Sequence, residues 1–94
     1  MSYSRDNAEL VGLRAVGWLA GNDDLLPVFL GATGADERQF REHHADPDFQ
    51  GSVLDFILMD DAWISAFCEE TGLDYSAPME ARAALPGGEA VHWT

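Results

Sequence analysis

Apolar residues recur at helical spacing along most of the chain, and short polar breaks divide this pattern into six segments. Positions three or four residues apart lie on one face of an α-helix, so each segment predicts a helix with one buried face. The predicted helices cover about residues 6–20, 24–33, 37–44, 47–59, 61–71 and 76–85. The sequence therefore predicts an all-α fold, a compact orthogonal bundle of five or six short helices.

The first predicted helix opens at Asp6, with Glu9 three residues later. This spacing is typical of a capping box, in which side chains satisfy free backbone N–H groups at a helix start. We expect its inward face to hold Leu10, Leu13, Val16 and Gly17, widened by Val11, Trp18 and Leu19. The two leucines are thus predicted to lie in the core.

The segment 47–59 carries the longest apolar stretch of the chain. Asp46 followed by proline is a common helix start, because proline lacks an N–H that would stay unpaired there. Apolar residues cover most of its circumference: Phe49, Val53, Leu54, Phe56, Ile57 and Leu58. We expect this to be the central helix. Within it, Asp55 is expected to pair with Arg14 or Arg82, or to face solvent.

A short pattern occurs twice in the chain. Residues 33–36 read Thr-Gly-Ala-Asp, and residues 71–74 read Thr-Gly-Leu-Asp. The wider stretches 18–36 and 56–74 share five identities in nineteen aligned pairs. Two similar helical units would explain this, and so would two unrelated helix ends that obey the same capping rules.

No break in the pattern is long or polar enough to be an interdomain linker, so residues 1–86 are predicted to form a single helical domain. Pro86-Gly87-Gly88 ends regular structure, because proline and glycine interrupt helices. Residues 87–94 are expected to form a flexible C-terminal tail. Its Trp93 would fold back on the core, hang free or anchor a protein partner.

The charge of the chain is strongly one-sided. Seventeen acidic residues face five arginines, there is no lysine, and the net charge is −12. Such a field repels phosphate groups, so direct nucleic-acid binding is excluded and an anionic membrane surface is disfavoured. It favours a basic protein partner, or mimicry of a nucleic acid.

Cellular location is indicated by what the sequence lacks. A single cysteine, Cys68, rules out an internal disulfide and suits a reducing compartment. The first residues lack the basic and apolar regions of a signal peptide. The longest apolar stretch, 53–59, is far shorter than the roughly 20 residues of a membrane span. We therefore expect a cytoplasmic protein.

Residues with metal-ligand side chains gather at positions 42–46 (Glu-His-His-Ala-Asp). Adjacent histidines on a helix point about 100° apart, and the His-x-x-x-His spacing of helical zinc sites is missing. A site would need His44 and Asp46 with a third ligand such as His92. Imidazoles at a helix C-terminus also interact well with its dipole. We predict no metal and no cofactor.

Catalytic residue types are sparse. Cys68 lies on an apolar stripe beside Glu69-Glu70, where burial and carboxylates both disfavour the reactive thiolate. Without lysine the chain can form neither a Schiff base nor a phosphate-binding loop of the usual kind. The pairs Asp23-Asp24 and Asp60-Asp61 have the positions of helix caps. We predict no catalytic residues and no enzyme.

Five stretches of the chain together resemble one family of short bacterial proteins. They are Trp18-Leu19-Ala20, residues 25–34, Asp46-Pro47-Asp48-Phe49, Val53-Leu54-Asp55-Phe56 and Ala81-Arg82-Ala83-Ala84-Leu85. The family, mostly alphaproteobacterial, is a domain of unknown function, number three-five-seven-two. Ala35 departs from its pattern, in which a larger aliphatic residue is expected. Because no activity is attached to the family, the resemblance implies a fold class and carries over no site residues.

The leading hypothesis is a small, non-enzymatic cytoplasmic protein-interaction module, whose acidic surface favours a basic protein partner. Homodimerisation stays open. One alternative is a metal-dependent accessory protein or enzyme that uses His43, His44 and Asp46. Another is a nucleic-acid mimic, which requires carboxylates spaced like phosphates along one face.

Overall fold

The computed structural model describes residues 4–85, which fold into six α-helices and contain no strand. The helices are α1 (Arg5–Ala20), α2 (Leu26–Thr33), α3 (Glu37–Glu42), α4 (Pro47–Ile57), α5 (Asp61–Thr71) and α6 (Ala77–Ala84). The all-α prediction is confirmed. The predicted tail, with Trp93, lies outside the described residues.

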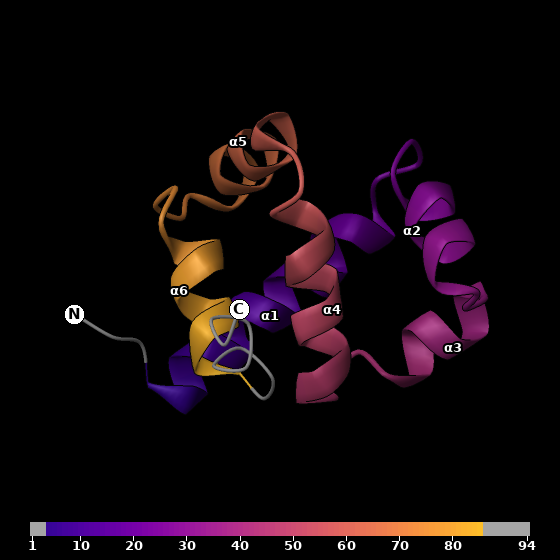
Figure 1. Ribbon diagram of the computed structural model, residues 1–94, viewed down its shortest axis with the longest axis horizontal. Helices are drawn as coiled ribbons and strands as arrows, with labels where there is room; N and C mark the ends of the chain where they lie inside the picture. Colours follow the sequence, from indigo (N-terminus) through magenta and orange to yellow (C-terminus); the bar gives the residue numbers. More distant parts are fainter. Residues whose placement is uncertain (1–3, 86–94) are drawn as a thin grey trace, which may run out of the picture.

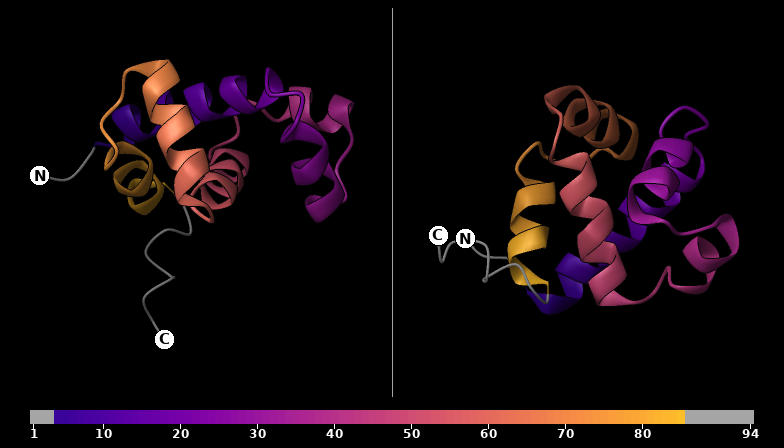
Figure 2. Two further views of the ribbon diagram at one scale, coloured as in Figure 1. Left: turned by 90° about the horizontal axis from the view of Figure 1, so that it is seen from above. Right: turned by 45° about the vertical axis from the view of Figure 1, so that its right-hand side comes forward.

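Three helices form the centre of the fold. Helices α4 and α6 lie next to each other, and α1 crosses one side of both (Figures 1 and 2). Helix α5 covers one end of α4 and α6, while α2 and α3 stand on the side of α4 that faces away from α6, beyond the last turns of α1. The arrangement places the longest helix, α1, where one face meets α4 and α6.

Small residues line much of the buried face of α1. Helix α1 buries Ala8, Gly12 and Ala15, together with Val11, Val16 and Leu19. A Cβ atom added to Gly12 would lie 2.7 Å from Gln50 Oε1 and 2.8 Å from Gln50 Cβ. Carbon atoms do not pack at such distances, so the side chain of Gln50 occupies the space that glycine leaves. The two helices approach closely because of Gly12.

The sequence-based orientation of α1 is therefore wrong in part. Val11, Val16 and Leu19 are buried as predicted, but three other residues of the predicted inward face are exposed. Leu10 is 58% exposed and Leu13 is 42% exposed, and Gly17 is exposed as well. Leucines on the inward face would hold α1 away from α4, whereas alanine and glycine allow the short distance that the structure has.

The predicted start of α1 is also wrong. Ser4, rather than Asp6, caps this helix, and its hydroxyl accepts a hydrogen bond from the Asn7 backbone N–H at 3.1 Å. Glu9 pairs with Arg5 at 2.8 Å instead of completing a capping box. The helix begins earlier because Ser4 supplies the oxygen that the first turn requires.

An ion pair joins α4 to α6. Arg82 Nε lies 2.7 Å from Asp55 Oδ1, which confirms one of the two predicted pairings. A Cβ atom on Gly51 would lie 2.8 Å from Arg82 Nη1, so the guanidinium lies directly over the backbone of α4. Helix α4, which the sequence predicts as the central helix, packs against α1, α5 and α6, but α1 packs against α4, α5 and α6 as well, so the two helices share the centre.

Aromatic side chains attach α2 and α3 to α4. The ring of Phe29 on α2 makes edge-to-face contacts with Phe40, Phe49 and Phe56, with centroids 5.4 to 5.9 Å apart. Such pairs stabilise by roughly 0.5–1.5 kcal/mol beyond the burial of their area. Phe29 thus fixes the position of α3 relative to the central helix.

The repeated pattern has the same geometry in both copies. Gly34 and Gly72 end α2 and α5 in the left-handed conformation, with φ of 77° and 76°. Thr33 Oγ1 donates to the Phe29 carbonyl at 2.9 Å, and Thr71 Oγ1 donates to the carbonyl of Phe67 at 2.7 Å. Glycine adopts this conformation without strain, so both copies are the same kind of helix end.

No helix within residues 4–85 is both long enough and apolar enough to cross a membrane.

A pair of substitutions tests the close contact of α1. Gly12→Ala should lower the free energy of unfolding by about 1–3 kcal/mol, because its methyl group overlaps Gln50 Cβ. Gly17→Ala on the same helix meets nothing within 4 Å and should raise the free energy by roughly 0.5–1 kcal/mol. Urea unfolding followed by circular dichroism measures both. Equal effects of the two substitutions would contradict the described contact.

Candidate functional site

The outward face of α1 carries an apolar stripe. Leu10, Leu13, Gly17 and Ala20 are spaced three or four residues apart, and all four are exposed. This spacing places them on one line along the helix. Because α1 buries its opposite face in the core, the stripe stays exposed along the outer side of the helix.

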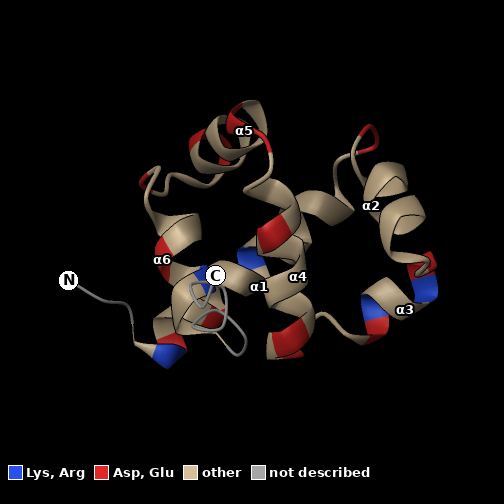
Figure 3. Ribbon diagram, viewed as in Figure 1, with Lys and Arg blue, Asp and Glu red and all other residues tan. Residues whose placement is uncertain are grey.

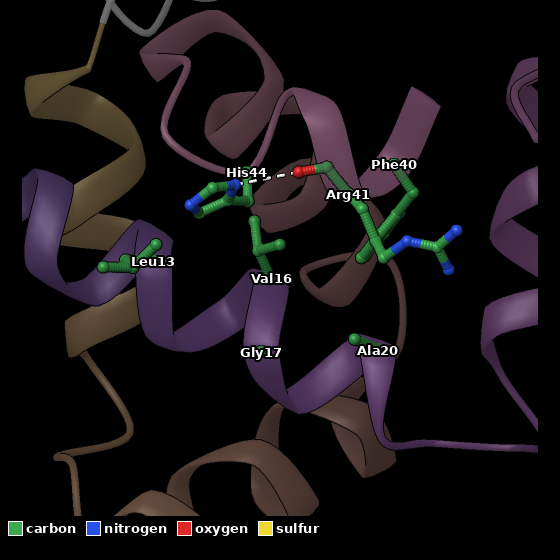
Figure 4. A pocket seen from close by; sticks show the side chains of 7 residues that line it. All are labelled: Leu13, Val16, Gly17, Ala20, Phe40, Arg41 and His44. Carbon is green, nitrogen blue, oxygen red and sulfur yellow. Dashed lines mark hydrogen bonds between the residues drawn. The ribbon is translucent and has the colours of Figure 1, made fainter. Parts of the chain in front are cut away.

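Two hollows follow this stripe. The larger, of about 480 Å³, is lined by Leu13, Val16, Gly17, Ala20, Phe40, Arg41 and His44 (Figure 4). The second, of about 270 Å³, is lined by Asp6, Glu9, Leu10, Leu13, Ala45 and Gln50. Leu13 belongs to both, so we treat them as one feature and call it the α1 groove. Its walls are α1 on one side and α3 with the start of α4 on the other.

Gln50 lies at the bottom of the second hollow. Its side chain is 3% exposed, and its Nε2 donates to the His44 carbonyl at 3.1 Å. Its Oε1 accepts no hydrogen bond from any residue that the structure describes. The signal in the sequence was a glutamine near the start of a mostly apolar helix, but only its contact with Gly12 reveals its position.

The residues proposed as metal ligands each have a local contact. His44 Nδ1 lies 2.8 Å from the Arg41 carbonyl oxygen (Figure 4). The ring of His43 lies against Phe49, with centroids 6.0 Å apart. Asp46 caps α4 and accepts from the Asp48 N–H at 3.0 Å. Residues 4–85 contain no group of three or more histidine, cysteine or acidic side chains arranged to hold a metal ion. His92 lies outside the described part of the chain.

The ends of the α1 groove differ in charge. Asp6 and Glu9 lie at one end, and Arg41 lies at the other. The ion pair of Arg41 with Glu37 is long, at 4.0 Å, and exposed, so it contributes little to stability. Acidic residues are spread over the rest of the described molecule (Figure 3). Any molecule that enters the groove therefore approaches through a negative field.

Cys68 is part of the core rather than of the groove. It is buried, and its Sγ donates to the Asp74 carbonyl at 3.3 Å. Burial, and to a smaller extent the charge of Asp74, raises the pKa of this thiol above its ordinary value. The thiol therefore stays protonated at neutral pH, in agreement with the expectation from its sequence position.

The reactivity of Cys68 provides a test. Its raised pKa and its burial should slow alkylation by iodoacetamide at pH 8 at least about tenfold relative to the urea-unfolded chain. Mass spectrometry of samples quenched over time gives both rates. Equal rates in buffer and in urea would show an accessible thiol and contradict the described burial.

Comparisons with known proteins bear on the whole chain. No curated protein matches it, and no solved structure does. A family model does match, over residues 5–88, and this range includes all six helices. The resemblance inferred from the sequence is thereby confirmed. The chain belongs to the family described as protein of unknown function DUF3572.

Proposed function

We propose that the chain is a small, non-enzymatic cytoplasmic interaction module that binds a basic, amphipathic helical segment of a partner protein in the α1 groove. The observation that carries the proposal is the pair of leucines, Leu10 and Leu13, exposed on α1 beside this groove.

The apolar stripe supplies a reason for binding. Burying a leucine side chain from water contributes roughly 1.5–3 kcal/mol when burial is complete. Leu10 and Leu13 are about half exposed, so a partner that covers both would gain a substantial part of this energy. Val16 and Phe40 extend the apolar wall beyond them.

The length of the groove suits a helix. Its lining residues on α1 extend from Asp6 to Ala20, which corresponds to about 20 Å along the helix axis. An amphipathic helix of about four turns presents apolar residues along a line of this length, as in other complexes in which a helix binds a groove.

Charge favours a basic partner. With a net charge of −12, the molecule attracts cationic segments and speeds their encounter. Asp6, at one end of the groove, offers a carboxylate to lysine or arginine of the segment, whereas the neighbouring Glu9 already pairs with Arg5. A second copy of the chain carries the same negative charge, so electrostatics favours a different partner over homodimerisation.

Titration with a designed peptide tests this function. The probe is an amphipathic peptide of about 16 residues, with leucines at positions i, i+3, i+4 and i+7 and lysines elsewhere. The amide NMR signals of residues that line the α1 groove should shift on addition of the peptide. Added salt should reduce the affinity of the peptide. Leu13→Gln should reduce affinity at least about fivefold, since it removes about 1 kcal/mol or more of apolar contact.

Two controls accompany this titration. Met79 on α6 is 63% exposed and lies outside the α1 groove, so Met79→Gln should bind the peptide as the wild type does. A peptide of the same composition in scrambled order keeps the charge and loses the apolar face, and it should bind more weakly. Shifts scattered over the whole surface, or an unchanged affinity of Leu13→Gln, would refute the proposal.

A further inference from the structure

Arg14 differs from the other arginines of the chain. Arg5, Arg38, Arg41 and Arg82 each pair with a carboxylate within the described residues. Arg14 makes no ion pair with any of residues 4–85, although acidic residues outnumber arginines by seventeen to five in the chain. Its guanidinium therefore keeps its capacity to bind an anion.

Arg14 lines a hollow on the opposite flank of Leu10 from the α1 groove. The hollow has a volume of about 380 Å³ and lies between α1 and the end of α5. It is lined by Asn7, Leu10, Val11, Arg14, Thr71, Gly72 and Leu73. No carboxylate is among these residues, and the neighbouring Glu69 and Glu70 of α5 do not line it. Within a strongly acidic molecule, this is a local environment with one positive charge.

We propose that this hollow binds a carboxylate attached to a short branched aliphatic group. The carboxylate pairs with the guanidinium of Arg14, which presents two parallel N–H donors in the geometry that a carboxylate accepts. The aliphatic group packs against Leu10, Val11 and Leu73. This ligand class goes beyond the proposed function, because it uses a different hollow and the opposite charge.

Both parts of the ligand are required. The net charge of −12 opposes the approach of any anion, so a bare anion such as acetate gains little from one exposed arginine. Apolar contact in the hollow adds the remaining affinity, and a volume of this size lies within the range of small-molecule sites. A free carboxylic acid and the C-terminus of a peptide that ends in leucine share this chemistry.

A matched pair of small molecules tests the proposal. 4-Methylpentanoate carries the carboxylate, and 4-methylpentanamide has the same shape without the charge. In amide NMR titrations at pH 7, the carboxylate should give saturable shifts around Asn7, Leu10 and Leu73, with at least fivefold higher affinity than the amide. Equal affinities, or shifts spread over other arginines, would overturn the assignment.

Variants identify the residue responsible. Arg14→Gln should abolish the preference for carboxylate over amide, and Arg14→Lys should retain only part of it, because lysine lacks the planar fork. Arg38→Gln is the matched control, since Arg38 is exposed and pairs with Glu42 on α3. A preference that survives in Arg14→Gln would contradict the proposal. If Arg14 interacts only with the dipole at the end of α5, the wild type will bind carboxylate and amide equally, and this result would also contradict the proposal.

Two further arms separate the possible outcomes. N-acetyl-alanyl-leucine, compared with its C-terminal amide, tells whether a peptide end binds more tightly than the free acid. Binding of the free acid or of the peptide C-terminus supports the proposal, provided that the carboxylate binds more tightly than the corresponding amide. Leu13→Gln should bind 4-methylpentanoate as the wild type does, because Leu13 does not line this hollow. Failure of the α1 groove to bind peptides therefore leaves this test intact.

Discussion

The close approach of α1 to α4 at Gly12 is the constraint on which the rest of the structure depends. The side chain of Gln50 occupies the space beside Gly12, and Ala8 and Ala15 continue the same face of α1. Only glycine fits directly beside Gln50, since interiors are packed to crystal-like density. The larger side chains Leu10 and Leu13 must then lie on the opposite face. The exposed apolar stripe is thus a direct consequence of how the core is packed.

The second determinant is the aromatic cluster that holds α2 and α3. Phe29 touches rings on α3 and α4, and these contacts attach α3 to the central helix while a hollow remains between α3 and α1. The α1 groove exists because α3 is held at this position. The packing of the core therefore also determines the shape of the proposed binding surface. The family assignment itself names no activity.

The sequence predicts much of this fold from local signals. Helix ends were predictable at Gly34, Gly72 and Asp46, because capping and left-handed glycines depend on neighbouring residues only. For Asp55 the sequence offers two charge partners, Arg14 and Arg82, and local signals do not distinguish between them. The orientation of α1 was not predictable, since both of its faces are apolar and the choice between them depends on size complementarity with Gln50, a residue far along the chain. The α1 groove and the hollow at Arg14 were missed for the same reason. Each is built from segments that are distant in sequence.

The most direct test of the account is the free energy of unfolding of a double variant, Leu10→Gln with Leu13→Gln. Glutamine has nearly the helix propensity of leucine, so the comparison reports on burial. If the leucines lie on the outward face and are half-buried as described, urea unfolding should show a loss of about 1–2 kcal/mol in total. A loss of about 4 kcal/mol or more, the least expected for two buried leucines, would mean that they belong to the core. It would contradict both the close α1 to α4 contact and the groove derived from it.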